Sequence, residues 1–185
     1  MGRIKCLIFD LDGTLFDTRK ANCVAYQRAF AYFGIRLTKA GYDSVFGLRF
    51  SEMAKKIAPT LFKNELNKVR ELKACYYKKC VKSVKLNNSL IELIKHFRKT
   101  CKICLVTSAS RKNTLFLLDH FKIRKYFDFV MCGENILLPK PHPSCYKECF
   151  KKFRISPREA LIFEDGEPGI EAARKSGGNY CVVKM

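Results

Sequence analysis

Two carboxylates stand one residue apart near the amino terminus, directly after an apolar segment. Asp10 and Asp12 end residues 5–12 (KCLIFDLD), whose first part is typical of a buried strand, and Gly13 follows them. Alternate residues of an extended chain share one face. Carboxylates this close repel each other unless they share a proton or a cation, which predicts a divalent metal with oxygen ligands, most simply Mg²⁺. The alternative is a pair of aspartates that only caps a turn.

A second acidic pair, Glu164 and Asp165, follows another apolar segment. Residues 160–163 (ALIF) precede it and Gly166 follows it, which repeats the arrangement at Asp10. Ligands of α/β proteins bind at the carboxyl ends of the strands, so both pairs are predicted to lie at one edge of a sheet. The alternative for Asp165 is that it only caps the helix that follows.

Two hydroxyls and a lysine complete the set of residues suited to phosphate chemistry. Thr107 and Ser108 end a third apolar segment, and hydroxyls together with the backbone N–H groups of a helix start form a phosphate-binding site. Lys140 lies between Pro139 and Pro141, in a stiff loop that is poorly suited to a merely solvated lysine. All these groups fall at, or just beyond, the ends of successive predicted strands.

Five apolar segments are predicted to be the strands that position these side chains: residues 5–10, 102–107, 127–132, 160–164 and 180–183. Helical patterns separate the last four. This alternation predicts an α/β fold with a doubly wound, mostly parallel, Rossmann-like sheet.

The stretch between the first two strands is far longer than a simple crossover requires. It carries two helical stripes of apolar residues, one ending near Tyr32 and one beginning at Phe62. We therefore predict an inserted all-helical cap domain at residues 18–85, and an α/β core formed by residues 1–17 and 86–185.

The chain is strongly basic. It has 185 residues with 36 Lys and Arg against 17 Asp and Glu, a formal net charge of +19, and its 48% hydrophobic content excludes a disordered, collagen-like or coiled-coil protein. Such a charge attracts phosphates, nucleic acid or anionic membranes. The excess is mostly lysine and concentrates in residues 55–85. Lysine is typical of a solvated face, which we favour over nucleic-acid binding.

The ten cysteines do not indicate a disulfide framework. The amino terminus lacks the anatomy of a signal peptide, so we expect a reduced, cytoplasmic protein. Several cysteines stand inside apolar segments, where a thiol acts as a small hydrophobe. No segment has the length and apolarity of a membrane span, and no membrane partner is expected.

Four motifs, FDLDGTLFDT, LVTSAS, PKPHP and FEDGEPGIEAA, occur in this order along the chain. In this respect the sequence resembles the haloacid dehalogenase superfamily of phosphohydrolases, in the branch of phosphoglycolate phosphatase and β-phosphoglucomutase. The predicted insert lies where that branch carries its helical cap. The resemblance implies a phosphatase that acts on a small phosphorylated metabolite.

The resemblance also implies roles for single residues. Asp10 is the expected nucleophile, which forms a phosphoaspartyl intermediate, and Asp12 the general acid and base. Thr107 and Lys140 are expected to stabilise the transferring phosphoryl oxygens, and Ser108 to help bind them.

The expected cofactor is Mg²⁺. Its implied ligands are the Asp10 carboxylate, the Asp12 backbone carbonyl and Asp165, with Glu164 in support. The presence of Asp12 favours transfer of the phosphoryl group to water over dehalogenase or phosphonatase chemistry, because those enzymes replace this residue.

Other activities stay open. A β-phosphoglucomutase has a cap histidine where this chain aligns Asn22, which favours a phosphatase over a mutase. Arg49 is expected either to bind a second anionic group of the substrate or to pair on the surface with Glu52. A phosphatase for nucleotides or nucleic-acid ends, and a basic nucleic-acid-binding module, remain alternatives. The oligomeric state is not predicted.

Overall fold

The computed structural model describes residues 3–185, and the chain forms two compact units. The first unit joins the segment that ends at Asp17 to Leu86–Met185, and the second is Thr18–Lys85. The first contains the sheet and the second is helical.

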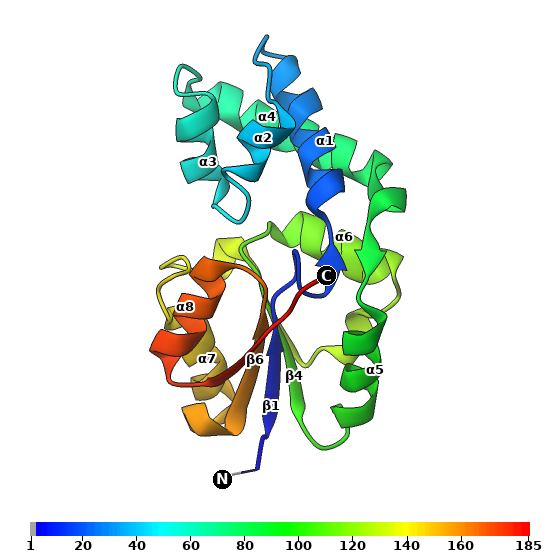
Figure 1. Ribbon diagram of the computed structural model, residues 1–185, viewed down its shortest axis with the longest axis vertical. Coiled ribbons are helices and arrows are strands. Elements are labelled where there is room, and N and C mark those ends of the chain that lie inside the picture. Colours follow the sequence, from blue (N-terminus) through cyan, green and yellow to red (C-terminus); the bar gives the residue numbers. More distant parts are fainter. Residues whose placement is uncertain (1–2) are drawn as a thin grey trace. The chain divides into compact units, whose positions relative to one another are not determined.

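The first unit contains a five-stranded sheet in which neighbouring strands pair in parallel. Its order is β5-β4-β1-β6-β7, so β1 is central and the chain winds outward from it in both directions (Figure 1). The strands are β1 (Cys6–Phe9), β4 (Lys102–Val106), β5 (Phe129–Met131), β6 (Ala160–Glu164) and β7 (Asn179–Val182). The predicted doubly wound, mostly parallel α/β fold is confirmed.

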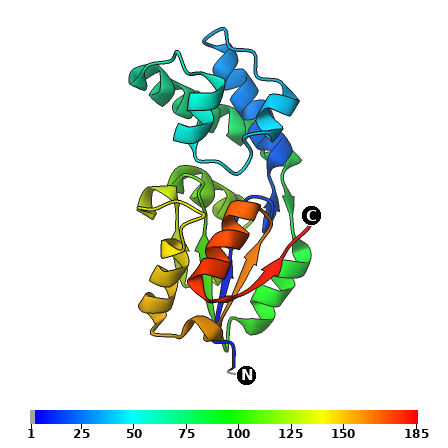
Figure 2. The ribbon, with the colours of Figure 1, turned by 60° about the vertical axis from the view of Figure 1, so that its left-hand side comes forward.

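Helices cover both faces of this sheet (Figure 2). Helices α7 and α8 lie on one face, and α5 lies on the other (Figure 1). The helices are α5 (Asn88–Phe97), α6 (Arg111–His120), α7 (Ser144–Phe153) and α8 (Glu167–Ser176), with short 3₁₀ turns at Arg124–Tyr126, Gly133–Asn135 and Pro157–Glu159.

Local sequence signals set where these helices begin and end. The Asn87 side chain accepts a hydrogen bond from the Leu90 N–H, and Ser110 accepts one from the Asn113 N–H, so each caps the helix that follows it. Helix α8 ends at Ser176, and Gly177 after it adopts the left-handed conformation with φ +79°.

The core explains why the strands appear as continuous apolar segments. Cys6 and Ile8 point to the face covered by α7 and pack in one cluster with Tyr146 and Phe150. Phe9 points to the opposite face, where its ring stacks on Phe163 with centroids 4.6 Å apart. Both faces are buried, so no polar alternation remains along the central strands.

The chain leaves the sheet unit through β2 (Phe16–Asp17) and returns through β3 (Lys85–Leu86). These two short strands pair with each other in a separate two-stranded sheet. Beside them, the Asn87 N–H donates to the Leu15 carbonyl at 2.9 Å. The end of the first segment, which carries the first motif, is thus held against the returning chain.

The second unit is built from helices. They are α1 (Arg19–Ala31), α2 (Lys39–Asp43), α3 (Phe50–Ile57), α4 (Lys63–Lys79) and the 3₁₀ turn Val81–Ser83. Helices α1 and α4 pack against each other, and the core includes Phe30, Tyr42, Met53 and Val69. Within residues 3–185, no helix combines the length and the apolarity that a membrane span needs.

Two residues of the predicted stripes are not in this core. Tyr32 is 64% exposed and Phe62 is 75% exposed. Both flank a helix rather than lie within it: Tyr32 follows the last residue of α1, and Phe62 precedes the first residue of α4. The prediction that these two residues lie on a buried stripe was wrong, whereas Phe33, the residue after Tyr32, packs against the core.

Candidate active site

The sheet brings the two acidic pairs to one place. β1 and β6 are neighbours with Phe9 level with Phe163, so Asp10 and Glu164 follow at the same height. The Asp10 N–H donates to the Phe163 carbonyl at 3.0 Å and continues the ladder. From β1 the strand order runs outward to β4 and β5 on one side and to β6 and β7 on the other. The order therefore reverses at β1, and α/β sheets bind ligands at such a switch point.

Three carboxylates converge at this point. Asp10, Glu164 and Asp165 each offer an oxygen within 4.8 Å of the others. Asp10 and Glu164 are buried, whereas Asp165 is half-buried. Oxygen donors in this number and spacing suit a hard divalent cation.

Lys140 reaches the same cluster from the loop before α7. Its Nζ lies 2.6 Å from Asp10 Oδ1 and 2.5 Å from Glu164 Oε1, and it also donates to the Val106 carbonyl at 3.2 Å. The side chain is only 7% exposed. A buried ammonium group needs such partners, so this lysine is fixed in the site rather than solvated.

Burial and mutual repulsion shift the protonation of the cluster. Burial raises the pKa of Asp10 well above its usual value; Lys140 opposes this shift, while Glu164 and Asp165 add to it. Burial, with the neighbouring Glu164, raises the pKa of Asp165 to about 6. For Lys140, burial acts to lower the pKa, but the charges of Asp10 and Glu164 outweigh it and raise that pKa well above its usual value.

Two glycines leave room for the carboxylates. Gly13 has φ +93°, and a Cβ added there would lie 2.0 Å from Asp165 Oδ2. A Cβ added to Gly169 in α8 would lie 2.2 Å from Glu164 Oε2. In each case the backbone approaches the carboxylate more closely than any side chain allows.

The sequence analysis missed three residues that hold the acidic pairs. Thr14 Oγ1 donates to Asp165 Oδ1 at 3.1 Å, and Asn87 Nδ2 donates to the Thr14 carbonyl at 3.2 Å. The Tyr146 hydroxyl hydrogen-bonds to Glu164 Oε1. Burial raises the pKa of Tyr146 well above its usual value, so this hydroxyl stays a neutral donor. A threonine after DG is a signal visible in the sequence, whereas Tyr146 resembles an ordinary core residue.

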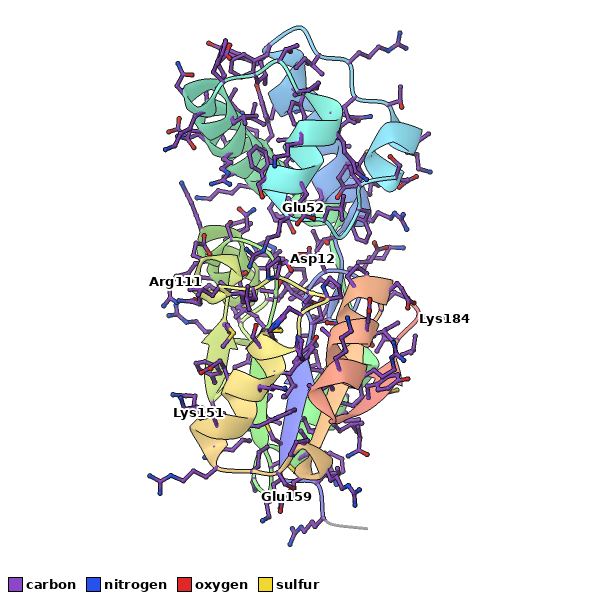
Figure 3. The ribbon with its side chains drawn as sticks, turned by 90° about the vertical axis from the view of Figure 1, so that its left-hand side faces the viewer. Asp12, Glu52, Arg111, Lys151, Glu159 and Lys184 are labelled. Carbon is purple, nitrogen blue, oxygen red and sulfur yellow. The ribbon has the colours of Figure 1, made fainter. Side chains whose placement is uncertain are left out.

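The other predicted site residues of the sheet unit lie at the same edge. Thr107 directly follows β4, is buried, and its Oγ1 accepts a hydrogen bond from the Ala109 N–H at 3.0 Å. Ser108 is half-buried beside it. Asp12 stands in the turn after β1, beyond the carboxyl end of that strand (Figure 3).

Two predicted residues belong to the helical unit. Arg49 is half-buried and directly precedes α3, where its carbonyl accepts from the Glu52 N–H at 3.0 Å. Asn22 is buried on α1, and its Nδ2 donates to Thr18 Oγ1 at 3.1 Å. The predicted substrate contact of Arg49 stays a prediction.

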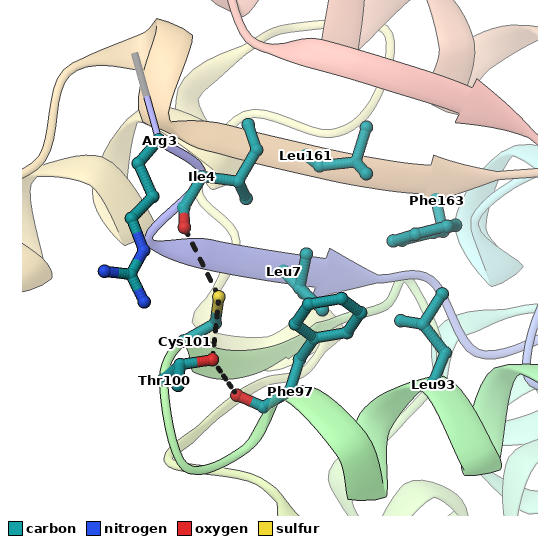
Figure 4. A pocket seen from close by; sticks show the side chains of 9 residues that line it. All are labelled: Arg3, Ile4, Leu7, Leu93, Phe97, Thr100, Cys101, Leu161 and Phe163. Carbon is teal, nitrogen blue, oxygen red and sulfur yellow. Dashed lines mark hydrogen bonds between the residues drawn. The ribbon is translucent and has the colours of Figure 1, made fainter.

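A pocket elsewhere on the sheet unit contains none of these residues (Figure 4). It has a volume of about 280 Å³ and lies between α5 and the sheet face that carries Leu7 and Phe163. Its lining is mainly apolar, and its polar side chains, Arg3, Thr100 and Cys101, include no carboxylate. This pocket offers no chemistry comparable to the acidic cluster.

The fold and the site together indicate an enzyme rather than a structural protein. The sheet is parallel, the acidic cluster lies at its switch point, and a helical unit is inserted between its first two strands along the chain. The chain belongs to the haloacid dehalogenase-like hydrolase family, which matches residues 7–183. The resemblance noted from the four motifs is thereby confirmed.

Named relatives cover nearly the whole chain. A phosphorylated carbohydrates phosphatase of Thermotoga maritima is 27% identical over 179 residues, which cover 94% of this chain and 82% of the relative. The fructose-1-phosphate phosphatase YqaB of Escherichia coli is 25% identical over 183 residues, 97% of this chain and 96% of the relative.

Solved structures share the fold. The β-phosphoglucomutase of Clostridium difficile superposes with a TM-score of 0.84 at 24% identity, covering 98% of this chain and 85% of that one. At this identity the likeness establishes the fold and not the reaction.

Proposed function

We propose that this protein is a Mg²⁺-dependent phosphatase that hydrolyses a small phosphate monoester through a phosphoaspartyl intermediate on Asp10. The observation that carries this proposal is the buried convergence of Asp10, Glu164, Asp165 and Lys140 at the switch point of the sheet. The names of the two relatives, both phosphatases, support it.

The residues of the cluster fit a magnesium ion. Asp10, Asp165 and Glu164 supply hard oxygen donors, and the missing side chain of Gly13 lets Asp165 come close to the first acidic pair. These residues would hold the ion together with the Asp12 backbone carbonyl. When bound, Mg²⁺ would offset the negative charges of the phosphate and of Asp10.

The proposed reaction uses the chain's own side chains in two steps. An Asp10 carboxylate oxygen bonds to phosphorus while the bond to the leaving oxygen breaks, and Asp12 gives its proton to that oxygen. Asp12 then takes a proton from water, whose oxygen attacks phosphorus and releases phosphate and the free Asp10 carboxylate. Lys140 and the Thr107 hydroxyl, with Ser108 beside it, hold the transferring oxygens.

We propose a small phosphorylated metabolite, such as a sugar phosphate, as substrate. The substrates in the names of the two relatives support this class. Arg49 would bind a second anionic group of that substrate, since a guanidinium forms paired hydrogen bonds with carboxylate and phosphate groups.

A panel of phosphate esters tests the function. With sugar phosphates, small acid phosphates and nucleotides, we expect phosphate release in Mg²⁺ and none in EDTA, with sugar phosphates among the best substrates. Interconversion of hexose phosphates without net phosphate release would instead identify a mutase. Activity only on nucleotides or nucleic-acid ends would contradict the proposed substrate class.

The raised pKa of Asp165 makes a prediction about pH. Metal binding requires the ionised carboxylate, and with a pKa of about 6 Asp165 is mostly ionised at pH 7 and mostly protonated at pH 5. We expect the Mg²⁺ affinity, measured by calorimetric titration, to fall about tenfold or more over this interval. In Asp165→Asn the affinity is expected to be weak and less dependent on pH. Equal affinity of the wild type at both pH values would contradict the assignment.

A further inference from the structure

We infer that Tyr146 is a positioning residue that fixes Glu164 and, through it, holds Lys140 against Asp10. This inference rests on the proposed function. It concerns a side chain that lies one contact away from the reacting groups and for which no motif gives a role.

One carboxylate oxygen joins the tyrosine to the lysine. Glu164 Oε1 accepts from Lys140 Nζ at 2.5 Å and also from the Tyr146 hydroxyl. Lys140 Nζ in turn lies 2.6 Å from Asp10 Oδ1. The chain of contacts from tyrosine to nucleophile is therefore continuous and consists of hydrogen bonds to charged groups, which are the strong ones in proteins.

Helix α8 confines the second carboxylate oxygen of Glu164, Oε2. Gly169 packs so closely that a Cβ would overlap Glu164 Oε2, and the Glu164 side chain is 3% exposed. Water is therefore a poor substitute for a lost donor. Without the tyrosine hydroxyl, Lys140 is the one donor left to Oε1 within residues 3–185, and the direction in which the carboxylate holds that ammonium is no longer fixed.

The hydroxyl is the part of Tyr146 that packing does not require. Its ring is fully buried in the apolar cluster on the sheet face covered by α7, together with Cys104, Cys145 and Ile162. A phenylalanine ring would fill the same space. The ring also lies beside the ammonium, with Lys140 Nζ 5.6 Å from its centroid, and phenylalanine keeps that contact.

The test begins with Tyr146→Phe and a matched control, Tyr180→Phe, on β7. Tyr180 is 42% exposed and is not one of the three carboxylate residues of the cluster. We expect Tyr146→Phe to lower kcat and kcat/KM together by about tenfold, the pattern of a lost transition-state interaction, and the control to match the wild type. An unchanged kcat in Tyr146→Phe overturns the inference.

A double-mutant cycle separates positioning from a general structural effect. In a Glu164→Ala background, and independently in Lys140→Ala, we expect Tyr146→Phe to cause less than a twofold further loss, because the route through which it acts is already broken. The same tenfold loss in either background would overturn the inference. Using two backgrounds keeps the test decisive if one variant does not fold, which circular dichroism and thermal unfolding show.

Failure of the inference is distinguishable from failure of the proposed function. Absence of Mg²⁺-dependent phosphate release by the wild type removes the proposed function, and with it the basis of the inference. Release by the wild type, with Tyr146→Phe equally active, removes the inference alone.

Discussion

Asp10→Asn is expected to lower phosphate release by about 10⁴-fold or more, because the amide cannot form the bond to phosphorus that the carboxylate forms. The substitution changes one atom and keeps the size of the side chain. Its backbone N–H still donates to the Phe163 carbonyl, so the strand end is preserved. The loss should therefore be chemical rather than structural.

The same variant is expected to unfold at a temperature no lower than the wild type when both are in EDTA. The pKa of Asp10 is raised in the folded protein by burial and by Glu164 and Asp165, although Lys140 opposes the shift. A raised carboxyl pKa means that folding favours the neutral form, so stability falls as the pH rises from the unfolded to the folded pKa. At pH 7 an uncharged asparagine avoids this penalty, and Lys140 keeps Glu164 as partner.

The measurements are phosphate release and thermal unfolding on the same preparations. Asp119→Asn is a suitable control, since Asp119 is an exposed residue of α6 that pairs with Arg124 at 3.3 Å. We expect it to retain wild-type activity. Phosphate release by Asp10→Asn at more than a hundredth of the wild-type rate would remove Asp10 from the role of nucleophile.

The sheet and its acidic cluster were predictable because parallel strands align their carboxyl ends. Once residues 5–10 and 160–164 are recognised as strands, Asp10 and Glu164 must lie at one edge, and only the strand order is needed to make them neighbours. The local pattern around Lys140 predicted only a lysine in a stiff loop near the strand ends, and the resemblance to the family supplied its expected role beside the transferring phosphoryl group. Its ion pairs with Asp10 and Glu164 depend on how the loop returns to the sheet, which no local pattern gives.

Contacts between a helix and a strand end were not predictable. Tyr146 and Glu164 are 18 residues apart, and an aromatic residue on the buried side of a helix indicates a core position and nothing more. Their hydrogen bond depends on how α7 packs against the sheet. The same limit applies to Gly169, whose close approach to Glu164 is a property of packing.

The basic character of the helical unit was predicted to be a solvated face, and one lysine departs from this. Lys73 of α4 is only 7% exposed. Its Nζ lies 4.3 Å from the centroid of the Tyr77 ring and 5.1 Å from that of Tyr26. Aromatic rings stabilise a cation over their faces, so a lysine at a core position of a helix is accommodated where tyrosines surround it. Net charge alone does not reveal this.

Gly13→Ala is expected to reduce phosphate release at least about a hundredfold and to weaken Mg²⁺ binding, because two independent requirements for glycine coincide there. The first is conformational: φ is +93°, where residues with a Cβ are strained. The second is steric: the new Cβ would lie 2.0 Å from Asp165 Oδ2. The Asp165 carboxylate must then shift, which disturbs its place in the cluster with Asp10 and its hydrogen bond with Thr14.

Gly34→Ala separates the two requirements. Gly34 also has a positive φ, +74°, but among the described residues no atom outside Gly34 and its two chain neighbours lies within 4 Å of the added Cβ. We expect it to lose roughly 1 kcal/mol of stability, the conformational cost alone, with phosphate release and Mg²⁺ affinity within twofold of the wild type. If Gly13→Ala loses stability to the same extent as Gly34→Ala but binds Mg²⁺ as tightly as the wild type, then the close approach of Gly13 does not shape the metal site. If Mg²⁺ binding weakens only in Gly13→Ala, the displaced Asp165 carboxylate accounts for the loss.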